Sequence, residues 1–270
     1  MNKYSSVSIL EVPLDFNSSH IRGPALAPPI IRRVLMNGSA NTTSESGIDV
    51  AKDERVKDAG VVSWETEAQA FVNIEQKCTE LAEQGSKILT LGGDHSITYP
   101  IVKALAKKHQ GLTILHFDAH PDLYDNQDGN KHGHGCPFAR IMEGKYAARL
   151  VQLGIRTLNR HQAEQAEQFG VEVHEMKNWS VDTPLNLTGP LYISFDLDGL
   201  DPAFAPGVSH FEPGGLSVRE VLQVLKKIDL PVVGADIVEY NPKTDINEMT
   251  AMVCAKIYKE LAAMLLKDLN

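Results

Sequence analysis

Six side chains of the types that bind metal ions follow three short apolar runs of the sequence. They are, in chain order, His95, Asp118, His120, Asp122, Asp196 and Asp198. Residues i, i+2 and i+4 of an extended strand end point to the same face, so Asp118, His120 and Asp122 are expected to lie together. Four carboxylates and two imidazoles in one place carry more negative charge than a protein gathers without cations. The spacing therefore predicts a metal site.

Two divalent ions would offset this charge and complete the ligand set. Hard oxygen ligands combined with imidazole favour Mn²⁺, with Zn²⁺ as the next choice, and Co²⁺ and Ni²⁺ are also plausible in such sites. Two ions that share a water molecule lower its pKa enough to give hydroxide near neutral pH. A single Asp-x-Asp pair, or a single histidine after a Gly-Gly turn, is a weak signal. Three such clusters together predict two Mn²⁺ per subunit and hydrolytic chemistry.

The apolar runs before these clusters are rich in β-branched residues and show no alternation, which is typical of parallel strands covered on both faces. The predicted strands are residues 88–91, 112–117, 150–155, 191–195 and 232–237, and the predicted helices are residues 66–84, 97–109, 217–227 and 248–266. This order predicts an α/β fold, a doubly wound parallel sheet with helices on both faces, in a single domain over residues 1–270. Residues 37–60 are expected to form a surface loop. Ligands of such sheets bind at the carboxyl ends of the strands, where the clusters lie.

The composition excludes several classes of protein. The 26 Lys and Arg against 35 Asp and Glu give a net charge of −9, which disfavours binding to the phosphates of nucleic acids. No apolar run is long enough to span a bilayer, and the N-terminus lacks the basic and apolar segments of a secretory signal. We therefore expect no nucleic-acid or membrane partner and a cytoplasmic location. Cys78, Cys136 and Cys254 are expected to be thiols, because they are odd in number and widely spaced.

The three motifs resemble the signatures of the ureohydrolase family, which includes arginases and agmatinases. They read GGDHS at 92–96, DAHPDL at 118–123 and SFDLDGLDPAFAPG at 194–207. Other segments resemble plant-type arginases, namely GPALAPPIIRR at 23–33, FARIMEG at 138–144, HFEPGGLS at 210–217, GADIVEYNP at 234–242 and MTAMV at 249–253. The resemblance covers nearly the whole chain and implies an arginase-like three-layer fold.

The resemblance also implies how the six ligands divide between two Mn²⁺ ions. One ion would be held by His95, Asp118, Asp122 and Asp196, and the other by Asp118, His120, Asp196 and Asp198. Asp118 and Asp196 would then bridge the two ions. Asp122 would have a second, catalytic role, since it would form a hydrogen bond to the metal-bridging hydroxide and hold it in place.

Further residues match positions that bind the substrate or move protons in the family. Glu239 would bind the guanidinium group, for which a planar carboxylate is a suitable partner. His134 is expected to carry protons between solvent and the leaving amine, since an imidazole titrates near working pH. His132 is the alternative to His134, or lines the substrate site instead. Asn130, in the loop that starts at Asp125, is expected to meet the substrate α-carboxylate.

The implied reaction is the hydrolysis of L-arginine to L-ornithine and urea, by attack of the metal-bridging hydroxide on the guanidino carbon. Agmatine, giving putrescine and urea, and a guanidino acid such as 4-guanidinobutyrate are the alternatives. Residues 154–160 read GIRTLNR and lack the aspartate with which animal-type arginases hold the α-amino group. The family also implies a homo-oligomer, a trimer or hexamer. A metal-dependent deacetylase or an inactive relative is disfavoured, because all six ligands are present.

Overall fold

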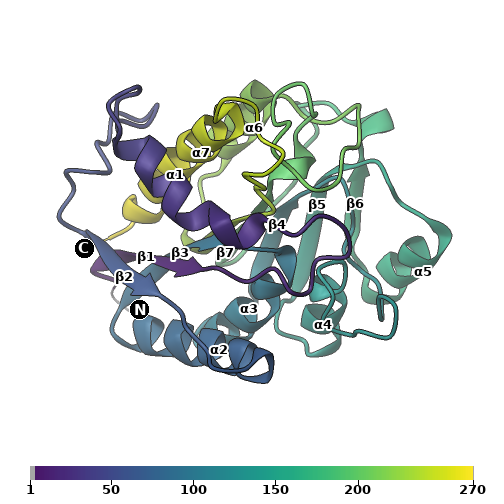
Figure 1. The fold of residues 1–270 in the computed structure, drawn as a ribbon. Helices are drawn as coiled ribbons and strands as arrows, with labels where there is room; N and C mark the ends of the chain where they lie inside the picture. The colour runs from purple at the N-terminus through teal and green to yellow at the C-terminus, as the bar shows by residue number, and fades with distance from the viewer. Residues whose placement is uncertain (1–3, 270) are drawn as a thin grey trace.

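The computed structural model describes residues 4–269, which form one eight-stranded parallel sheet between two layers of helices (Figure 1). The sheet order is β2-β1-β3-β8-β7-β4-β5-β6. The strands are β1 (Ser6–Val12), β2 (Val56–Val61), β3 (Ser86–Gly92), β4 (Thr113–Phe117), β5 (Arg149–Ile155), β6 (Glu172–Glu175), β7 (Leu191–Asp196) and β8 (Val232–Val238). The predicted fold class is confirmed. The prediction of one domain over residues 1–270 stays a prediction, which the continuous sheet supports.

Helices cover both faces of the sheet (Figure 1). One layer holds α1 (Ala27–Met36), α6 (Val218–Lys227) and α7 (Met249–Leu266), and the other holds α2 (Glu67–Glu83), α3 (Thr98–Ala106), α4 (Pro137–Glu143) and α5 (Arg160–Phe169). Neighbouring strand residues enter opposite cores: Ile88 packs with the α2–α3 layer and Leu89 with the α1–α7 layer. This arrangement explains why the strands read as continuous apolar runs.

All five predicted strands and all four predicted helices are present, with ends that differ by at most three residues. The strands β1, β2 and β6 and the helices α1, α4 and α5 were not predicted from the sequence. The prediction that residues 37–60 form only a loop is wrong at its end, where β2 begins at Val56. The strands β2 and β6 are the two edges of the sheet and are only partly buried, so their apolar pattern is weak. Cys78, Cys136 and Cys254 are buried free thiols, as predicted.

The four central strands position the polar clusters. In the order β3-β8-β7-β4 they are hydrogen-bonded neighbours, although they come from distant parts of the chain. His95 follows β3, Glu239 follows β8, Asp196 ends β7 and Asp118 follows β4. Because the strands are parallel, their carboxyl ends lie on the same side of the sheet, and these residues meet there.

Candidate active site

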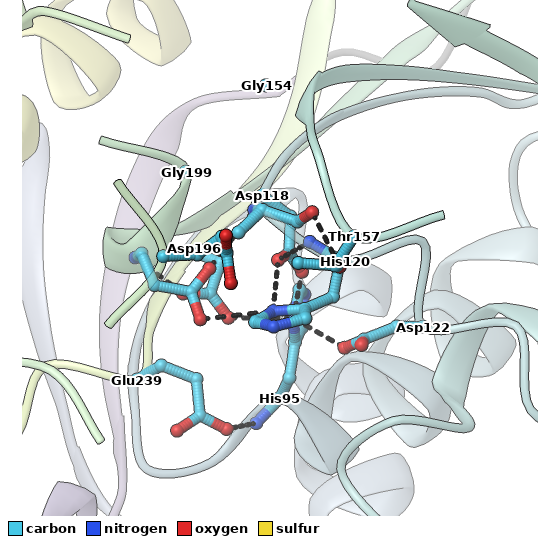
Figure 2. Close-up of polar contacts among 12 residues, drawn as sticks. His95, Asp118, His120, Asp122, Gly154, Thr157, Asp196, Gly199 and Glu239 are labelled. Atoms are coloured by element: carbon cyan, nitrogen blue, oxygen red, sulfur yellow. Dashed lines mark hydrogen bonds and ion pairs between the residues drawn. The ribbon is translucent and has the colours of Figure 1, made fainter. Parts of the chain in front are cut away.

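The first group of predicted ligands meets around His95, which starts the short helix η2 (His95–Ile97) after β3. The Nδ1 atom of His95 lies 3.1 Å from Oδ2 of both Asp122 and Asp196 (Figure 2). The same atom lies 3.2 Å from Oδ2 of Asp118. These four residues are buried, and His95 Nδ1 has no hydrogen-bond partner among the described residues. One imidazole nitrogen and three carboxylate oxygens therefore face a common point.

A second group meets around His120. Its Nδ1 atom lies 3.2 Å from Asp118 Oδ1 and 3.2 Å from Asp198 Oδ2. Asp118 therefore belongs to both groups, one oxygen to each, which is the geometry of a bridging carboxylate. Oxygen and imidazole donors of this kind fit Mn²⁺. His116 also lies beside Asp118, so that His95, His116 and Asp118 bring three ligand atoms together.

The loop that carries Asp118 and Asp122 is not extended. The strand β4 ends at Phe117, and Asp122 adopts a left-handed backbone conformation with a φ of 52°. The Asp118 carboxylate caps this turn, since its Oδ1 accepts a 2.6 Å hydrogen bond from the backbone N–H of His120. The predicted extended geometry of residues 118–122 is therefore wrong, although the three side chains do converge. A left-handed non-glycine residue is strained, and such strain is frequent at functional sites.

Two glycines let the backbone close in around Asp118 (Figure 2). A Cβ atom on Gly199 would lie 2.7 Å from the backbone nitrogen of Asp118. A Cβ atom on Gly154, whose φ is +94°, would lie 2.7 Å from the Asp118 carbonyl oxygen. Any larger residue at either position would displace Asp118, the residue that the two groups share.

The segment that lacks the animal-type aspartate has a structural role here. Arg156 donates hydrogen bonds to the backbone carbonyl oxygens of Asp198 at 2.7 Å and Glu212 at 2.6 Å. It thereby ties the loop after β7 to the segment before α6. Thr157 lines the active-site pocket and donates to the Ala119 carbonyl oxygen at 3.0 Å.

Burial sets the pKa values of the carboxylates in the absence of a cation. Burial, together with the negative charges of Asp198 and Asp118, raises the pKa of Asp196 well above its ordinary value. Burial also raises the pKa of Asp198 to about 6, although His120 opposes the shift. The neighbouring carboxylates outweigh burial at His95, whose pKa rises well above its ordinary value. The raised pKa values of Asp196 and Asp198 mean that their ionised forms are unfavourable without a nearby cation, as expected of a cation site.

The affinity for Mn²⁺ should therefore depend on pH. Because the pKa of Asp198 is raised to about 6 in the metal-free protein, the carboxyl is protonated below that pH and an ion must displace the proton. We expect the affinity to fall by about tenfold per pH unit, for each proton displaced, as the pH drops from 6 to 5. Calorimetric titration with Mn²⁺ at several pH values measures this slope. An affinity that stays constant between pH 7 and 5 would contradict the assignment of Asp198 as a ligand.

Glu239 lies between the two groups of predicted ligands and the pocket beside them. It is buried, and its φ of 61° is left-handed. Its Oε1 accepts hydrogen bonds from the backbone N–H of His95 at 2.8 Å and from Nδ1 of His134 at 2.9 Å. This His134 contact lowers the pKa of Glu239 against the effect of burial, and it raises the pKa of His134 to about 9. Oε2 is buried and has no hydrogen-bond partner among the described residues, so one carboxylate oxygen is free for a ligand.

A pocket of about 230 Å³ opens above these residues. Six of the predicted site residues line it, namely His120, Asp122, His134, Asp196, Asp198 and Glu239. The other polar side chains of the lining had no role predicted from the sequence. They are Ser19, Tyr124, Gln127, Thr157, Gln162 and His210. His210 begins the HFEPGGLS segment, and its motif was the only signal that could have identified it. Its ring centroid lies 5.4 Å from that of His134.

Two predicted substrate contacts lie outside the pocket lining. Asn130 ends a tight turn, and its side-chain Nδ2 donates to Asn17 Oδ1 at 3.0 Å. The ring of His132 stacks on Tyr99, with centroids 5.7 Å apart, and packs edge-on against Phe71. The Gly129–Pro137 loop therefore points His134 into the site and His132 away from it.

Comparisons with known proteins agree with this geometry. The model of the arginase family matches residues 5–264. Arginase 1, mitochondrial, of Arabidopsis thaliana is 49% identical over 97% of this chain and 82% of its own length. The mitochondrial guanidino acid hydrolase of Homo sapiens is 36% identical over 96% of this chain and 78% of its own length. The solved arginase of Medicago truncatula superposes with a TM-score of 0.92 at 42% identity, covering 98% of this chain and 89% of that one.

The prediction of a cytoplasmic location is wrong. The Arabidopsis relative is named mitochondrial, and matching arginases from rice and Medicago truncatula carry the same description. The prediction rested on net charge and on the absence of a secretory pattern, and neither property separates one aqueous compartment from another. Within residues 4–269, no helix combines the length and apolarity needed to cross a membrane.

Proposed function

This chain belongs to the arginase family, and on that premise we propose that it hydrolyses L-arginine to L-ornithine and urea with two Mn²⁺ ions per subunit. The family makes it a hydrolase of guanidino or amidino groups. The plant arginases among its relatives, and the close superposition with a plant arginase, support L-arginine as the substrate. The two His–Asp groups that share Asp118 support a binuclear centre.

The observation that carries the proposal is the free Oε2 of Glu239 in the pocket beside the two groups. A guanidinium ion presents N–H donors in one plane and is a strong partner for a carboxylate. The Oε1 atom is already held by His95 and His134, so the orientation of the carboxylate is fixed before a substrate arrives. Glu239 would therefore direct the guanidino carbon towards the metal ligands.

Two bound Mn²⁺ ions would supply a strong nucleophile by lowering the pKa of water. The residues of the chain do the rest. Asp122, whose Oδ2 faces His95, would accept a hydrogen bond from the attacking group and hold it in line. His134 would donate a proton to the leaving amine, because its ring lies in the pocket and its charged form is favoured by Glu239. Its Nε2 lies 2.7 Å from Ser19 Oγ, and this contact would open when Nε2 donates its proton to the amine.

Replacing His134 tests its role as the proton donor. We expect His134→Asn to lower kcat by about 10²- to 10⁴-fold, the usual contribution of a positioned general acid. The metal content should not change, because His134 belongs to neither ligand group. His132→Asn is the matched control and should keep nearly full activity, since His132 lies outside the pocket lining. The assignment fails if the two variants show the opposite pattern.

The substrate is tested by urea release from the Mn²⁺-loaded protein with L-arginine, agmatine and 4-guanidinobutyrate in parallel. The described residues that line the pocket include no lysine or arginine. An α-carboxylate would therefore be met by neutral donors such as Ser19 and His210. We expect a clear preference for L-arginine in kcat/KM. A preference for agmatine or the guanidino acid would keep the metal chemistry and overturn the substrate.

We also propose that the protein is a homo-oligomer, a trimer or hexamer, as the family resemblance implies. Size-exclusion chromatography with light scattering measures the mass of the species in solution. A monomer at micromolar concentration would contradict this part of the proposal.

A further inference from the structure

A buried pair of side chains lies behind the shared ligand Asp118. His116 of β4 and Gln152 of β5 are directly paired in the register of the two strands, and both are fully buried. Nε2 of His116 lies 2.8 Å from Asp118 Oδ2, and Nδ1 of His116 lies 3.0 Å from the side-chain nitrogen of Gln152. The His116 ring is also packed against Phe138, with centroids 4.1 Å apart.

A third contact fixes the orientation of the Gln152 amide. Its side-chain nitrogen lies 2.6 Å from the backbone carbonyl oxygen of Pro121. A carbonyl oxygen can only accept a hydrogen bond, so the group that faces it must be the NH₂ of the amide. The flipped amide would place two acceptors against each other at that distance. The Oε1 atom is left buried without a partner among the described residues, which shows that the amide is placed for its nitrogen.

This orientation determines where the proton of His116 sits. The NH₂ group gives one hydrogen to Pro121 and its second hydrogen to Nδ1 of His116, which must then be the unprotonated, accepting nitrogen. The ring proton is therefore on Nε2 and is donated to Asp118 Oδ2. An Nε2–H group cannot bind a metal ion, so His116 supports the site and is not a seventh ligand.

We propose that Gln152 is a positioning residue that selects the Nε2–H tautomer of His116 and thereby fixes the orientation of Asp118 and Asp122. It acts on Asp118 through His116, and on Asp122 through the peptide between Pro121 and Asp122. That peptide precedes the left-handed residue of the loop, so the same amide restrains a strained conformation. The consequence for metal binding rests on the proposed function, in which both aspartates are ligands.

The tautomer is read directly from the ring nitrogens of ¹⁵N-histidine-labelled, metal-free protein by NMR. The His116 signals are those absent from His116→Gln. We expect a protonated Nε2 and an unprotonated Nδ1, and a protonated Nδ1 in the wild-type protein would overturn the proposal. This test needs no activity and no metal, and it does not require a Gln152 variant to fold. If the tautomer is as expected but the wild-type protein binds no Mn²⁺, the proposed function fails and the positioning of His116 stands.

The effect on the metal site is read by calorimetric titration with Mn²⁺. We expect Gln152→Met, which keeps the length of the side chain and removes its donors, to weaken Mn²⁺ binding by roughly 10- to 100-fold, as outer partners of metal ligands usually do. It should also change the tautomer signals of His116. Gln165→Met is the matched control, since Gln165 is a buried glutamine outside the site, and it should bind Mn²⁺ as the wild type does.

The double variant separates the route through His116 from a general loss of packing. A glutamine at position 116 keeps an N–H donor near Asp118 and has no tautomer to select. We expect Gln152→Met to cost clearly less Mn²⁺ affinity in the His116→Gln background than in the wild type. An equal loss in both backgrounds would show that Gln152 does not act through the tautomer and would overturn the proposal.

Discussion

Asp196→Ala is expected to abolish both turnover and the retention of metal. The carboxylate of Asp196 ends β7, faces His95 Nδ1 at 3.1 Å through Oδ2, and accepts the backbone N–H of Asp198 at 2.8 Å through Oδ1. Its removal takes away a ligand and releases the turn that orients Asp198. The loss of Mn²⁺ affinity should exceed the roughly 10- to 100-fold that an outer partner costs. Metal analysis after desalting and urea release measure the two effects.

The stability of the metal-free protein distinguishes metal loss from misfolding. Burial beside two other carboxylates raises the pKa of Asp196, so the charged form is unfavourable in the folded protein without metal. The Tm of Asp196→Ala in the presence of a chelator should therefore equal or exceed that of the wild type. Asp229→Ala, at an exposed site, is the control and should keep metal and activity. A fully active Asp196→Ala protein that retains two metal ions would contradict the proposed binuclear site.

Glu239→Gln should lose activity while keeping the metal ions. The amide can still accept from the His95 N–H through its oxygen, but it places an NH₂ group where the free Oε2 meets the substrate. Breaking a buried ion pair by removing one charge costs about 3–5 kcal/mol, which corresponds to roughly 10²- to 10⁴-fold in kcat/KM. Steady-state kinetics and metal analysis of the same preparation test this expectation.

Glu248 provides the matched control for Glu239→Gln, because it is also a glutamate with a left-handed backbone conformation. Glu248 has a φ of 59°, its side chain is 45% exposed, and it pairs with Arg33 at the surface. Glu248→Gln should leave kcat/KM within about twofold, because an exposed ion pair contributes little. If Glu239→Gln retains wild-type kcat/KM, the guanidinium contact is not made by this carboxylate.

The sequence contained enough to predict the centre of the fold and the convergence of the candidate metal ligands. Apolar runs such as 191–195 are buried on both faces and are unambiguous, and the candidate ligands follow those runs directly. Some of the outer helices were not predictable in the same way. The helix α1 has Pro28 and Pro29 in its first turn. Prolines are typical helix breakers but are tolerated there, because no N–H bond is lost. The helix α5 is largely polar, so its buried face gives little signal.

The outer part of the site required the structure because loops from distant positions assemble it. Ser19 and His210 reach the pocket from segments nearly 200 residues apart in the chain, and no local spacing connects them. His132 was assigned by its closeness in sequence to His134, and Asn130 by its place in the loop that starts at Asp125, but a tight turn places both at the surface. Backbone conformation in a glycine-rich loop thus decides which side chains meet the substrate.

The strand order also constrains when this site can exist during synthesis. In the finished sheet, β3 and β4 are consecutive in sequence but are separated by β8 and β7, which come from the last third of the chain. A nascent chain that ends before residue 191 has no partner for the inner edges of β3 and β4, and such open edges are prone to aggregation. His95 and Asp118 are brought into contact only by strands made later. The proposed metal site is therefore assembled late in synthesis, and metal binding would indicate that the central strands of the sheet have paired.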